Sequence, residues 1–406
     1  MPTRFVVIGG GLAAATAVSE LRSLGFDGAI DLVAAEPRRP YERPPLSKGY
    51  LTGADDRESV FVHAEGWEAE YDVTPHLGVA ARGIAEGRVE LDDGTSLAFD
   101  QILIATGATP RPLPVPGGDA PGVHTFRTLD DADALRASLA EGGRRVVCVG
   151  SGWIGLELAA AARGYGNEVT VVTRSRAPLA AALGDEMGGV FRELHEDHGV
   201  TFLLERQVLA IETGSGDSAT GVRTDRELVP ADVVIVGIGA VPDTELAETA
   251  GAAIDGGILV DESMRTSVEG IFAAGDAANA FHPVLGARLR SEHWANAIAS
   301  GKVAAASMLG RDAALDDVPY FFTDQYDLGM EYSGYAPLAD DAEVVVRGDR
   351  RSGEFIAFWV QGDRVVAGMN VNIWDVQYQV QRLIRDRVAV DRTQLADSAI
   401  DLASIA

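Results

Sequence analysis

The sequence predicts an α/β chain in which two domains are each built on a parallel β-sheet. Two observations support this prediction. A strand, a glycine-rich turn and a helix occur at residues 4–25, and the same succession returns at residues 145–163. The chain has 406 residues. Single hydrophobic cores stop growing near ~250–300 residues, so two or three domains are expected.

The first unit begins with a short apolar run at residues 4–8, which is typical of a buried parallel strand. The turn Gly9-x-Gly11-x-x-Ala14 follows at once, and after it come a helix and a second strand. Glu36 stands just beyond that strand. In Rossmann-like domains such a turn lets the backbone approach a pyrophosphate, and an acid at this place accepts hydrogen bonds from an adenosine ribose. The unit therefore predicts a dinucleotide site.

The second unit repeats this arrangement. A strand is expected at residues 145–149, the turn Gly150-x-Gly152-x-x-Gly155 follows it, and a further strand is expected at residues 168–172. The chain is therefore expected to bind two dinucleotides. An N-terminal motif with a second motif inserted later is typical of flavoenzymes that bind FAD first and a nicotinamide cofactor second.

Two further segments fit a flavoenzyme. One is a buried strand that ends in the turn Thr106-Gly107, and the other is a strand that leads into Gly275 and Asp276 at a helix start. An aspartate in such a turn can accept a hydrogen bond from a ribityl hydroxyl. Alternatively, Asp276 is a plain helix N-cap.

Charge and composition exclude several classes of protein. There are 34 lysine and arginine residues against 61 aspartate and glutamate residues, a net charge of −27. Such a chain should repel nucleic acid and anionic lipid. No apolar run reaches the ~18 residues that a membrane span needs. The N-terminus lacks the layout of a signal peptide, so a cytoplasmic location is expected.

At this point the chain resembles a known family, the FAD-dependent, glutathione-reductase-like ferredoxin reductases of monooxygenase and dioxygenase systems. The resemblance covers nearly the whole chain and includes residues 41–48, 126–131, 152–157, 291–297 and 322–326, of which 41–48 and 291–297 are quite specific to the family. It implies an FAD-binding domain at residues 1–108 and 236–310 and an NAD(P)H-binding domain at residues 109–235. It also implies a C-terminal α+β reductase domain, an antiparallel sheet with helices, at residues 311–406.

The resemblance also implies roles for individual side chains. Lys48 would lie beside the reactive edge of the isoalloxazine, where an ammonium stabilises negative charge on the reduced flavin, and Glu157 would be its ion-pair partner. Alternatively, Lys48 is a solvated loop charge and Glu157 is a favourable acid in a first helical turn. Arg127 would reach the FAD pyrophosphate, and Trp294 would meet the flavin through its backbone.

The full set of residues expected at the two cofactors lies in turns, at strand ends and in the segments quoted above. It consists of Gly9, Gly11, Ala13, Ala14, Glu36, Arg43, Lys48, Ala81, Ala105, Thr106, Gly107, Arg127, Gly150, Gly152, Ile154, Gly155, Thr173, Arg174, Arg176, Gly239, Gly275, Asp276, Glu292, His293 and Trp294. The catalytic residues expected within this region are Lys48 and Glu157. No metal site is expected.

One departure from the family concerns the choice of electron donor. NADH-using relatives place an acid for the adenosine 2′-OH after the second strand, and here that position is Thr173, followed by Arg174 and Arg176. Two arginines would attract a 2′-phosphate. NADPH is therefore expected to serve as a donor. Alternatively, the arginines are solvated and NADH still binds through the glycine turn.

The single cysteine limits the route of the electrons. Cys148 falls inside the second Rossmann strand, where it should be buried and inert, so neither a disulfide relay nor a cysteine-rich metal site is possible. Electrons should leave the flavin singly, for a [2Fe–2S] ferredoxin or a rubredoxin. Four cations can be interpreted either as a basic docking patch for that partner or as ordinary surface charge. They are Arg288, Arg290, Lys302 and Arg311.

The remaining side chains give weaker signals. His195 and His198 are expected on a helix surface, and none of the seven histidines looks catalytic, although His293 adjoins the flavin by resemblance. Trp359 is expected in the core of a sheet. Trp374 is expected either to cover the flavin or to pack in the core.

The predicted function is NAD(P)H-dependent reduction, through FAD, of a [2Fe–2S] ferredoxin that serves a cytochrome P450 or Rieske-type oxygenase. Three alternatives remain open. They are a reductase of quinones or monodehydroascorbate, a rubredoxin- or nitrite-linked reductase, and an NAD(P)H-binding flavoprotein similar to apoptosis-inducing factor.

Overall fold

The computed structural model describes residues 3–405 and divides them into two compact units. Unit 1 contains residues 3–43, 57–109 and 241–321, and unit 2 contains residues 44–56, 110–240 and 322–405. The chain passes between the units at five places, two of which lie in β8 (Ala108–Pro110) and β17 (Ala240–Pro242).

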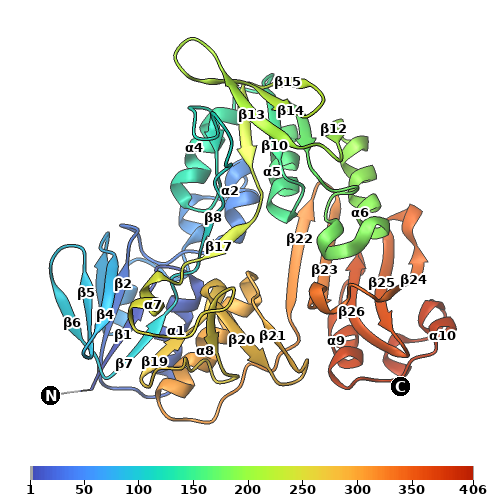
Figure 1. Ribbon diagram of the computed structural model, residues 1–406. Coiled ribbons are helices and arrows are strands. Elements are labelled where there is room, and N and C mark those ends of the chain that lie inside the picture. The colour runs from blue at the N-terminus through green and yellow to red at the C-terminus, as the bar shows by residue number, and fades with distance from the viewer. Residues whose placement is uncertain (1–2, 406) are drawn as a thin grey trace. The chain divides into compact units, whose positions relative to one another are not determined.

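Unit 1 is built on a parallel sheet with strand order β19-β7-β1-β2-β3. Figure 1 labels β1, β2, β7 and β19 of this sheet. Its strands are β1 (Arg4–Ile8), β2 (Ala29–Ala34), β3 (Val73–Leu77), β7 (Gln101–Ile104) and β19 (Ile271–Ala273). The apolar run of β1 is buried on both faces, as the sequence predicts. Helices α1 (Leu12–Ser23) and α8 (Trp294–Met308) pack closely at Gly301. A Cβ there would lie 2.6 Å from the Ala13 carbonyl oxygen, so the absence of a side chain allows this approach.

Two small sheets and short helical segments complete unit 1. The first sheet is an antiparallel meander, and the second pairs its three strands in the order β18-β20-β21. These elements are β4 (Ala81–Ala85), β5 (Arg88–Leu91), β6 (Ser96–Ala98), β18 (Ile258–Val260), β20 (Ala278–His282), β21 (Ala287–Leu289), α3 (Trp67–Glu70), α7 (Glu245–Thr249), η2 (Arg57–Val60) and η3 (Gly275–Ala277).

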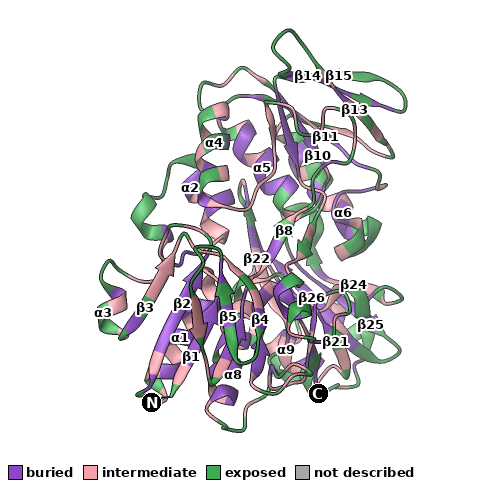
Figure 2. Ribbon diagram, turned by 60° about the vertical axis from the view of Figure 1, so that its left-hand side comes forward, coloured by how far each residue is buried: buried purple, intermediate pink, exposed green. Residues whose placement is uncertain are grey.

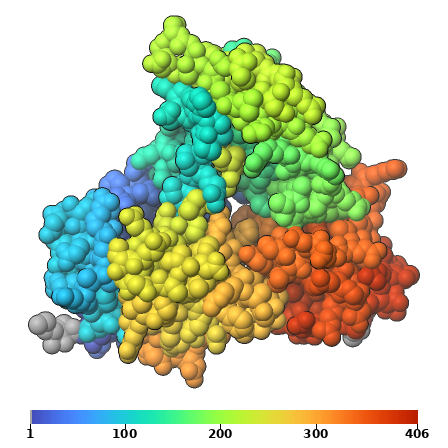
Figure 3. Space-filling model, viewed as in Figure 1, coloured from blue at the N-terminus to red at the C-terminus, as the bar shows by residue number. Residues whose placement is uncertain are grey.

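Unit 2 repeats the parallel arrangement with strand order β12-β11-β10-β16-β9. Its strands are β9 (Val123–His124), β10 (Arg145–Val149), β11 (Glu168–Val172), β12 (Val200–Leu203) and β16 (Val233–Val236). The helical segments around this sheet are η1 (Pro44–Ser47), α2 (Gly49–Thr52), α4 (Leu129–Leu139), α5 (Trp153–Gly164) and α6 (Ala180–Asp197). An antiparallel sheet of β13 (Val208–Thr213), β14 (Ala219–Thr224) and β15 (Leu228–Pro230) lies at the surface (yellow-green in Figure 3).

The C-terminal part of unit 2 is a sheet with strand order β22-β23-β26-β25-β24, antiparallel in its pairs β23–β26, β25–β26 and β24–β25. Its elements are β22 (Tyr320–Gln325), β23 (Leu328–Gly334), β24 (Glu343–Asp349), β25 (Glu354–Gln361), β26 (Arg364–Val371), α9 (Gln377–Arg385), α10 (Arg392–Ala396), η4 (Ala336–Leu338), η5 (Arg350–Ser352) and η6 (Leu402–Ser404). Trp359 is buried in this sheet, as expected. Trp374 is 54% exposed, so its alternative place in the core is wrong.

The core of each unit runs along its central sheet, whose strands are mostly buried (purple in Figure 2). The fold class predicted from the sequence is confirmed, with two Rossmann-like sheets and a C-terminal α+β part. Among residues 3–405, no helix combines the length and the apolar character that crossing a bilayer requires.

Candidate functional site

The first glycine turn of unit 1 has the geometry of a dinucleotide cradle. Gly9 adopts φ +139°, and a Cβ on it would lie 2.2 Å from the Ala105 carbonyl oxygen. A side chain at Gly9 is therefore excluded by both backbone conformation and space. At Gly11, which precedes α1, a Cβ would meet no atom within 4 Å. The turn thus packs tightly against the sheet and is open on its other side, which suits a pyrophosphate at the helix N-terminus.

Further segments meet this turn at the carboxyl ends of β1, β7 and β19. Gly275 has φ +70°, and a Cβ there would lie 3.1 Å from the Ala13 Cβ. Its amide donates to Ser300 Oγ on α8 (3.0 Å). Asp276 is thereby held beside the start of α1, and Thr106 donates to the Asp243 carbonyl (2.7 Å). Ligands of open parallel sheets bind outside the carboxyl ends of the strands, so these residues fit FAD.

Glu36 follows β2 and is held by two neighbours. Tyr41 Oη donates to Glu36 Oε2 (2.6 Å), and the Arg43 guanidinium lies 3.6 Å from Glu36 Oε1. The backbone amide of Gly78 donates to the Glu36 carbonyl (3.1 Å), which brings the segment before Ala81 alongside. The acid thus follows the second strand of the sheet, and in Rossmann-like domains an acid at this place can accept hydrogen bonds from an adenosine ribose.

His293 and Trp294 begin helix α8. The His293 ring stacks on Phe321 with a centroid separation of 4.2 Å. Burial lowers the pKa of His293 to about 4, against the opposing effect of Asp276, so the ring is neutral at pH 7. A neutral stacked ring is suited to packing rather than to proton transfer at this pH.

The second glycine turn, in unit 2, repeats the first in detail. Gly150 has φ +103°, and a Cβ on it would lie 2.2 Å from the Gly237 carbonyl oxygen. A Cβ at Gly155 would lie 2.6 Å from the Gly150 carbonyl oxygen, whereas one at Gly152 would meet nothing within 4 Å. Ile154, in the first turn of α5, is 44% exposed. This turn fits the pyrophosphate of a second dinucleotide.

The loop after β11 closes against this turn. Ser151 Oγ donates to Thr173 Oγ1 (2.9 Å), and both residues are buried. Arg174 is exposed, and within residues 3–405 it has no hydrogen-bond or ion-pair partner. The Arg176 guanidinium lies 3.7 Å from Glu205 Oε1. One of the two predicted arginines is therefore available to an anion, and the other has a counter-charge.

A buried polar cluster surrounds Lys48 within unit 2. The Lys48 ammonium and Glu157 Oε1 are 2.5 Å apart, so these residues form the expected ion pair. Glu157 also accepts hydrogen bonds from Ser47 Oγ (2.5 Å) and Thr323 Oγ1 (2.6 Å), and its side chain is only 5% exposed. The Lys48 ammonium lies 5.8 Å from the centroid of the Phe322 ring. The cluster fixes a positive charge at a largely dry position.

The hydrogen bonds continue from this cluster to α6. Gln325 Nε2 donates to Thr323 Oγ1 (3.2 Å), and His195 Nε2 lies 2.7 Å from Gln325 Oε1. The prediction that His195 lies on a helix surface is wrong, since the ring is fully buried and packs near Phe202 and Tyr326. Burial lowers the pKa of His195 to about 4. The neutral ring must donate through Nε2 to satisfy the Gln325 carbonyl oxygen.

The remaining predicted residues lie as follows. Arg127 precedes the capping box of α4, where its amide donates to Asp131 Oδ2 (3.0 Å). Gly239 follows β16 with φ +96°, and Glu292 forms an ion pair with Arg290. Sequence reasoning missed Ser47, Thr323, Gln325 and Glu205 as members of these clusters.

Most of the proposed docking cations have internal partners. Arg288 donates to the Val260 carbonyl (3.0 Å), and Arg311 donates to the Leu24 carbonyl (2.5 Å). Lys302 is exposed on α8. The docking patch remains a prediction, and of its four cations Lys302, Arg288 and Arg311 are exposed.

Cys148 lies in β10, where it is buried, and burial raises the pKa of its thiol to about 12. The prediction of a buried, inert cysteine is confirmed. A thiol with such a pKa does not provide a thiolate at neutral pH.

Comparison with known proteins agrees with this geometry. Residues 3–301 match the pyridine nucleotide-disulphide oxidoreductase family, and residues 320–406 match the reductase C-terminal family. The ferredoxin–NAD(+) reductase component of the anthranilate 1,2-dioxygenase system of Burkholderia cepacia is 40% identical over 98% of both chains. Rhodocoxin reductase of Rhodococcus erythropolis is 39% identical over 98% of this chain and 93% of its own.

A solved structure gives the same result at the level of the fold. The reductase in the covalent putidaredoxin reductase–putidaredoxin complex superposes with a TM-score of 0.94 at 33% identity, over 98% of this chain and 97% of the other. The chain therefore belongs to the pyridine nucleotide-disulphide oxidoreductase family, in the branch of FAD-dependent ferredoxin reductases that its sequence resembles.

Proposed function

We propose that this protein uses NAD(P)H to reduce a [2Fe–2S] ferredoxin that supplies a cytochrome P450 or Rieske-type oxygenase. The observation that supports this most directly is the combination of two glycine cradles of the same geometry with a buried Lys48–Glu157 pair. The relatives' names support a ferredoxin as acceptor. With its one cysteine buried and protonated, the chain offers no thiol relay.

FAD, when bound, would accept two electrons as hydride and release them singly. In this proposal residues 1–108 and 236–310 hold FAD, with Glu36 at the ribose and Asp276 near the ribityl chain. Residues 109–235 hold the nicotinamide cofactor, and residues 311–406 form the C-terminal domain. These assignments rest on the glycine geometry described above.

Lys48 is assigned an electrostatic role. Glu157, Ser47 and Thr323 hold its ammonium in one orientation, and its side chain is 18% exposed. A fixed cation in a poorly hydrated position stabilises negative charge that develops nearby without reorganising solvent. Glu157 is a positioning residue in this scheme, because its carboxylate contacts Lys48.

The donor preference is a finer part of the proposal. Arg174 is exposed and without a partner among residues 3–405, which supports use of NADPH, while the names of the relatives quoted above mention NAD(+) or no donor. Replacing Arg174 by glutamate should lower affinity for NADPH and spare NADH. Unchanged Michaelis constants for both donors would reject this role of Arg174.

The direct test is anaerobic reduction of the purified holoenzyme by NADH and by NADPH, followed by transfer to a [2Fe–2S] ferredoxin coupled to cytochrome c. Fast bleaching of the flavin and ferredoxin-dependent cytochrome c reduction are expected. Slow bleaching by both donors, or turnover that is independent of ferredoxin, would refute the proposal. A cytoplasmic location, predicted from the sequence, stays a prediction.

A further inference from the structure

Glu205 adopts a backbone conformation that is unfavourable for a glutamate. It lies in the loop between β12 and β13 and has φ +53°, in the left-handed region. Among residues with side chains, asparagine and aspartate adopt this region most readily, and glycine adopts it at no steric cost. The conformation is held by the Glu205 amide, which donates to the Ser175 carbonyl (3.2 Å). Glu205 is one of ten non-glycine residues with positive φ among residues 3–405, and residues held in this way cluster at ligand-binding sites.

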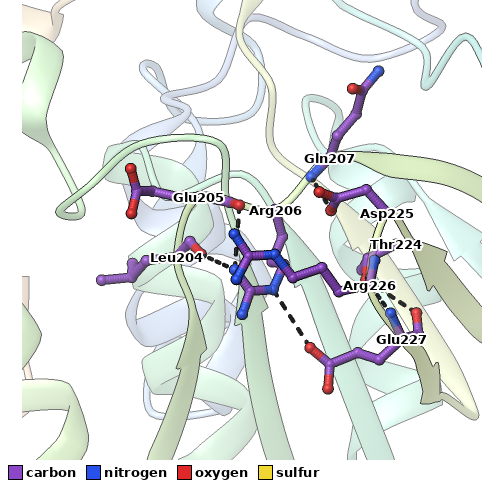
Figure 4. Close-up of polar contacts among 8 residues, drawn as sticks. All are labelled: Leu204, Glu205, Arg206, Gln207, Thr224, Asp225, Arg226 and Glu227. Atoms are coloured by element: carbon purple, nitrogen blue, oxygen red, sulfur yellow. Dashed lines mark hydrogen bonds and ion pairs between the residues drawn. The ribbon is translucent and has the colours of Figure 1, made fainter.

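The Glu205 carboxylate points toward the loop after β11. Its Oε1 lies 3.7 Å from Arg176 Nε, and the two side chains are 62% and 78% exposed. The Glu205 carbonyl, by contrast, accepts a hydrogen bond from Arg206 Nη1 (3.3 Å). Figure 4 shows the Glu205 carboxylate turned away from Arg206, Asp225 and Glu227. The carboxylate is therefore separate from the polar cluster that holds the Arg206 guanidinium.

That Arg206 cluster anchors the loop. Arg206 Nη1 donates to the Leu204 carbonyl (2.9 Å), and its Nε lies 3.5 Å from Glu227 Oε1 (Figure 4). The Arg206 amide donates to the Thr173 carbonyl (2.9 Å). The β12 loop is thus joined by backbone hydrogen bonds to the β11 loop at two places, and these bonds hold the two loops side by side.

The loops meet where the adenosine ribose of a Rossmann-bound nucleotide lies, at the end of the second strand and beside the glycine turn. Thr173 takes the place expected for an acid and is bonded to Ser151 of that turn. The charges exposed around this point are Arg174, Arg176 and Glu205. Because Arg176 already has Glu205 as a counter-charge, the local charge is smaller than the two arginines alone suggest.

We propose that Glu205 is a specificity-determining residue that opposes a 2′-phosphate on the adenosine ribose and so weakens the preference for NADPH that Arg174 alone would give. A phosphate monoester carries about −1.5 to −2 charges at pH 7, and a nearby carboxylate repels it. A ribose hydroxyl meets no such repulsion and can donate to a carboxylate. In effect the acid absent at position 173 is supplied by the neighbouring loop. This inference rests on the proposed function, since it assumes a nicotinamide donor in unit 2.

The test compares two nucleotides that differ only in the 2′-phosphate. Isothermal titration of the FAD-loaded full-length protein with adenosine 2′,5′-bisphosphate and with AMP gives the ratio of their affinities without turnover. In Glu205→Gln this ratio should rise about three- to tenfold in favour of the bisphosphate, as expected for one exposed charge removed from beside a phosphate. The rise should shrink as salt is added.

The matched control is Glu212→Gln, which removes the same charge from a separate ion pair with Arg223 (Nε–Oε1 2.7 Å), outside the Arg206 cluster, and should leave the ratio unchanged. Glu205→Gly removes the charge and also relieves the backbone, so it tests the same prediction in a variant that folds readily. An unchanged ratio in both Glu205 variants, or an equal rise in the control, would overturn the role of Glu205.

Failure of the proposed function is a separate result. If the wild-type protein supports ferredoxin-dependent reduction of cytochrome c but the affinity ratio is the same with and without the Glu205 carboxylate, only the proposed role of Glu205 is refuted. If the wild-type protein binds neither nucleotide, the proposed nicotinamide site falls and the role of Glu205 with it.

Discussion

Thr323 gives the sharpest test of the buried cluster around Lys48. Replacing Thr323 by valine keeps the shape of the side chain and removes its hydroxyl. That hydroxyl donates to Glu157 Oε1 (2.6 Å) and accepts from Gln325 Nε2 (3.2 Å). Thr323 and Gln325 are both 1% exposed, so water cannot easily replace either contact.

The expected cost follows from these two contacts. A hydrogen bond to a charged acceptor contributes about 1.5–3 kcal/mol, and a buried donor left unpaired costs about 1–3 kcal/mol. The Gln325 contact is long, which favours the lower end of the second range, so Thr323→Val should lose about 3 kcal/mol. Thr323→Ser keeps the hydroxyl and loses only a buried methyl group, about 1 kcal/mol. The two variants should therefore differ by about 2 kcal/mol.

Urea unfolding of the holoenzyme, followed by circular dichroism, measures this difference. A loosened Glu157 should also hold Lys48 less firmly, so flavin reduction by the preferred donor should slow in Thr323→Val more than in Thr323→Ser. Equal midpoints and equal reduction rates in the two variants would refute the reasoning, because the hydroxyl would then contribute nothing.

Three further predictions concern other parts of the chain. Gly9→Ala should lower the FAD content of the purified protein, because the added Cβ would lie 2.2 Å from the Ala105 carbonyl oxygen. The control Gly25→Ala, at a glycine that also has positive φ but where a Cβ would meet no atom within 4 Å, should keep its FAD. Equal FAD:protein ratios in the two variants would contradict this prediction. Glu205→Gly should raise the free energy of unfolding by about 1 kcal/mol, since glycine adopts the left-handed region without strain, and an unchanged urea midpoint would argue against strain there. Because the pKa of His195 is lowered to about 4 in the folded protein, the unfolded chain binds a proton there first, and stability falls as the pH drops from about 6.5 to about 4. In wild type this proton uptake should lower the free energy of unfolding by up to about 3 kcal/mol between about pH 6.5 and about pH 4, and in His195→Gln this contribution to the fall should be absent. Unfolding measured at several pH values tests this, and parallel pH profiles of the two proteins would contradict the burial argument.

The fold and both glycine turns could be predicted because their signals are local. A buried apolar run, a spaced set of glycines and a helix occupy about 25 consecutive residues in each unit, and their geometry follows from short-range sterics. The Lys48 cluster was predictable only as a pair, and only from resemblance. Ser47, Glu157 and Thr323 come from three distant segments, and no periodic pattern in a sequence indicates that they meet.

Two other features show why side-chain details escaped prediction. His195 lies four residues after Phe191 and eight after Met187, a helical spacing that marks a buried face, and all three are fully buried. The polar character of histidine had favoured the surface instead. At Glu205 no glycine or asparagine marks the left-handed turn, so the sequence carries no local signal for the position of its carboxylate.

Gly9 and Gly150, the first glycines of the two turns, lie equally close to a backbone carbonyl. A Cβ on either residue would lie 2.2 Å from the carbonyl oxygen. This likeness means that the pyrophosphate cradle is a shared frame with little power to distinguish one nucleotide from another. Discrimination must come from the few groups beyond the second strand of each unit, Glu36 in one and the Thr173 and Glu205 loops in the other. An engineer who wants a different electron donor should then be able to exchange a handful of loop positions and leave both cores untouched.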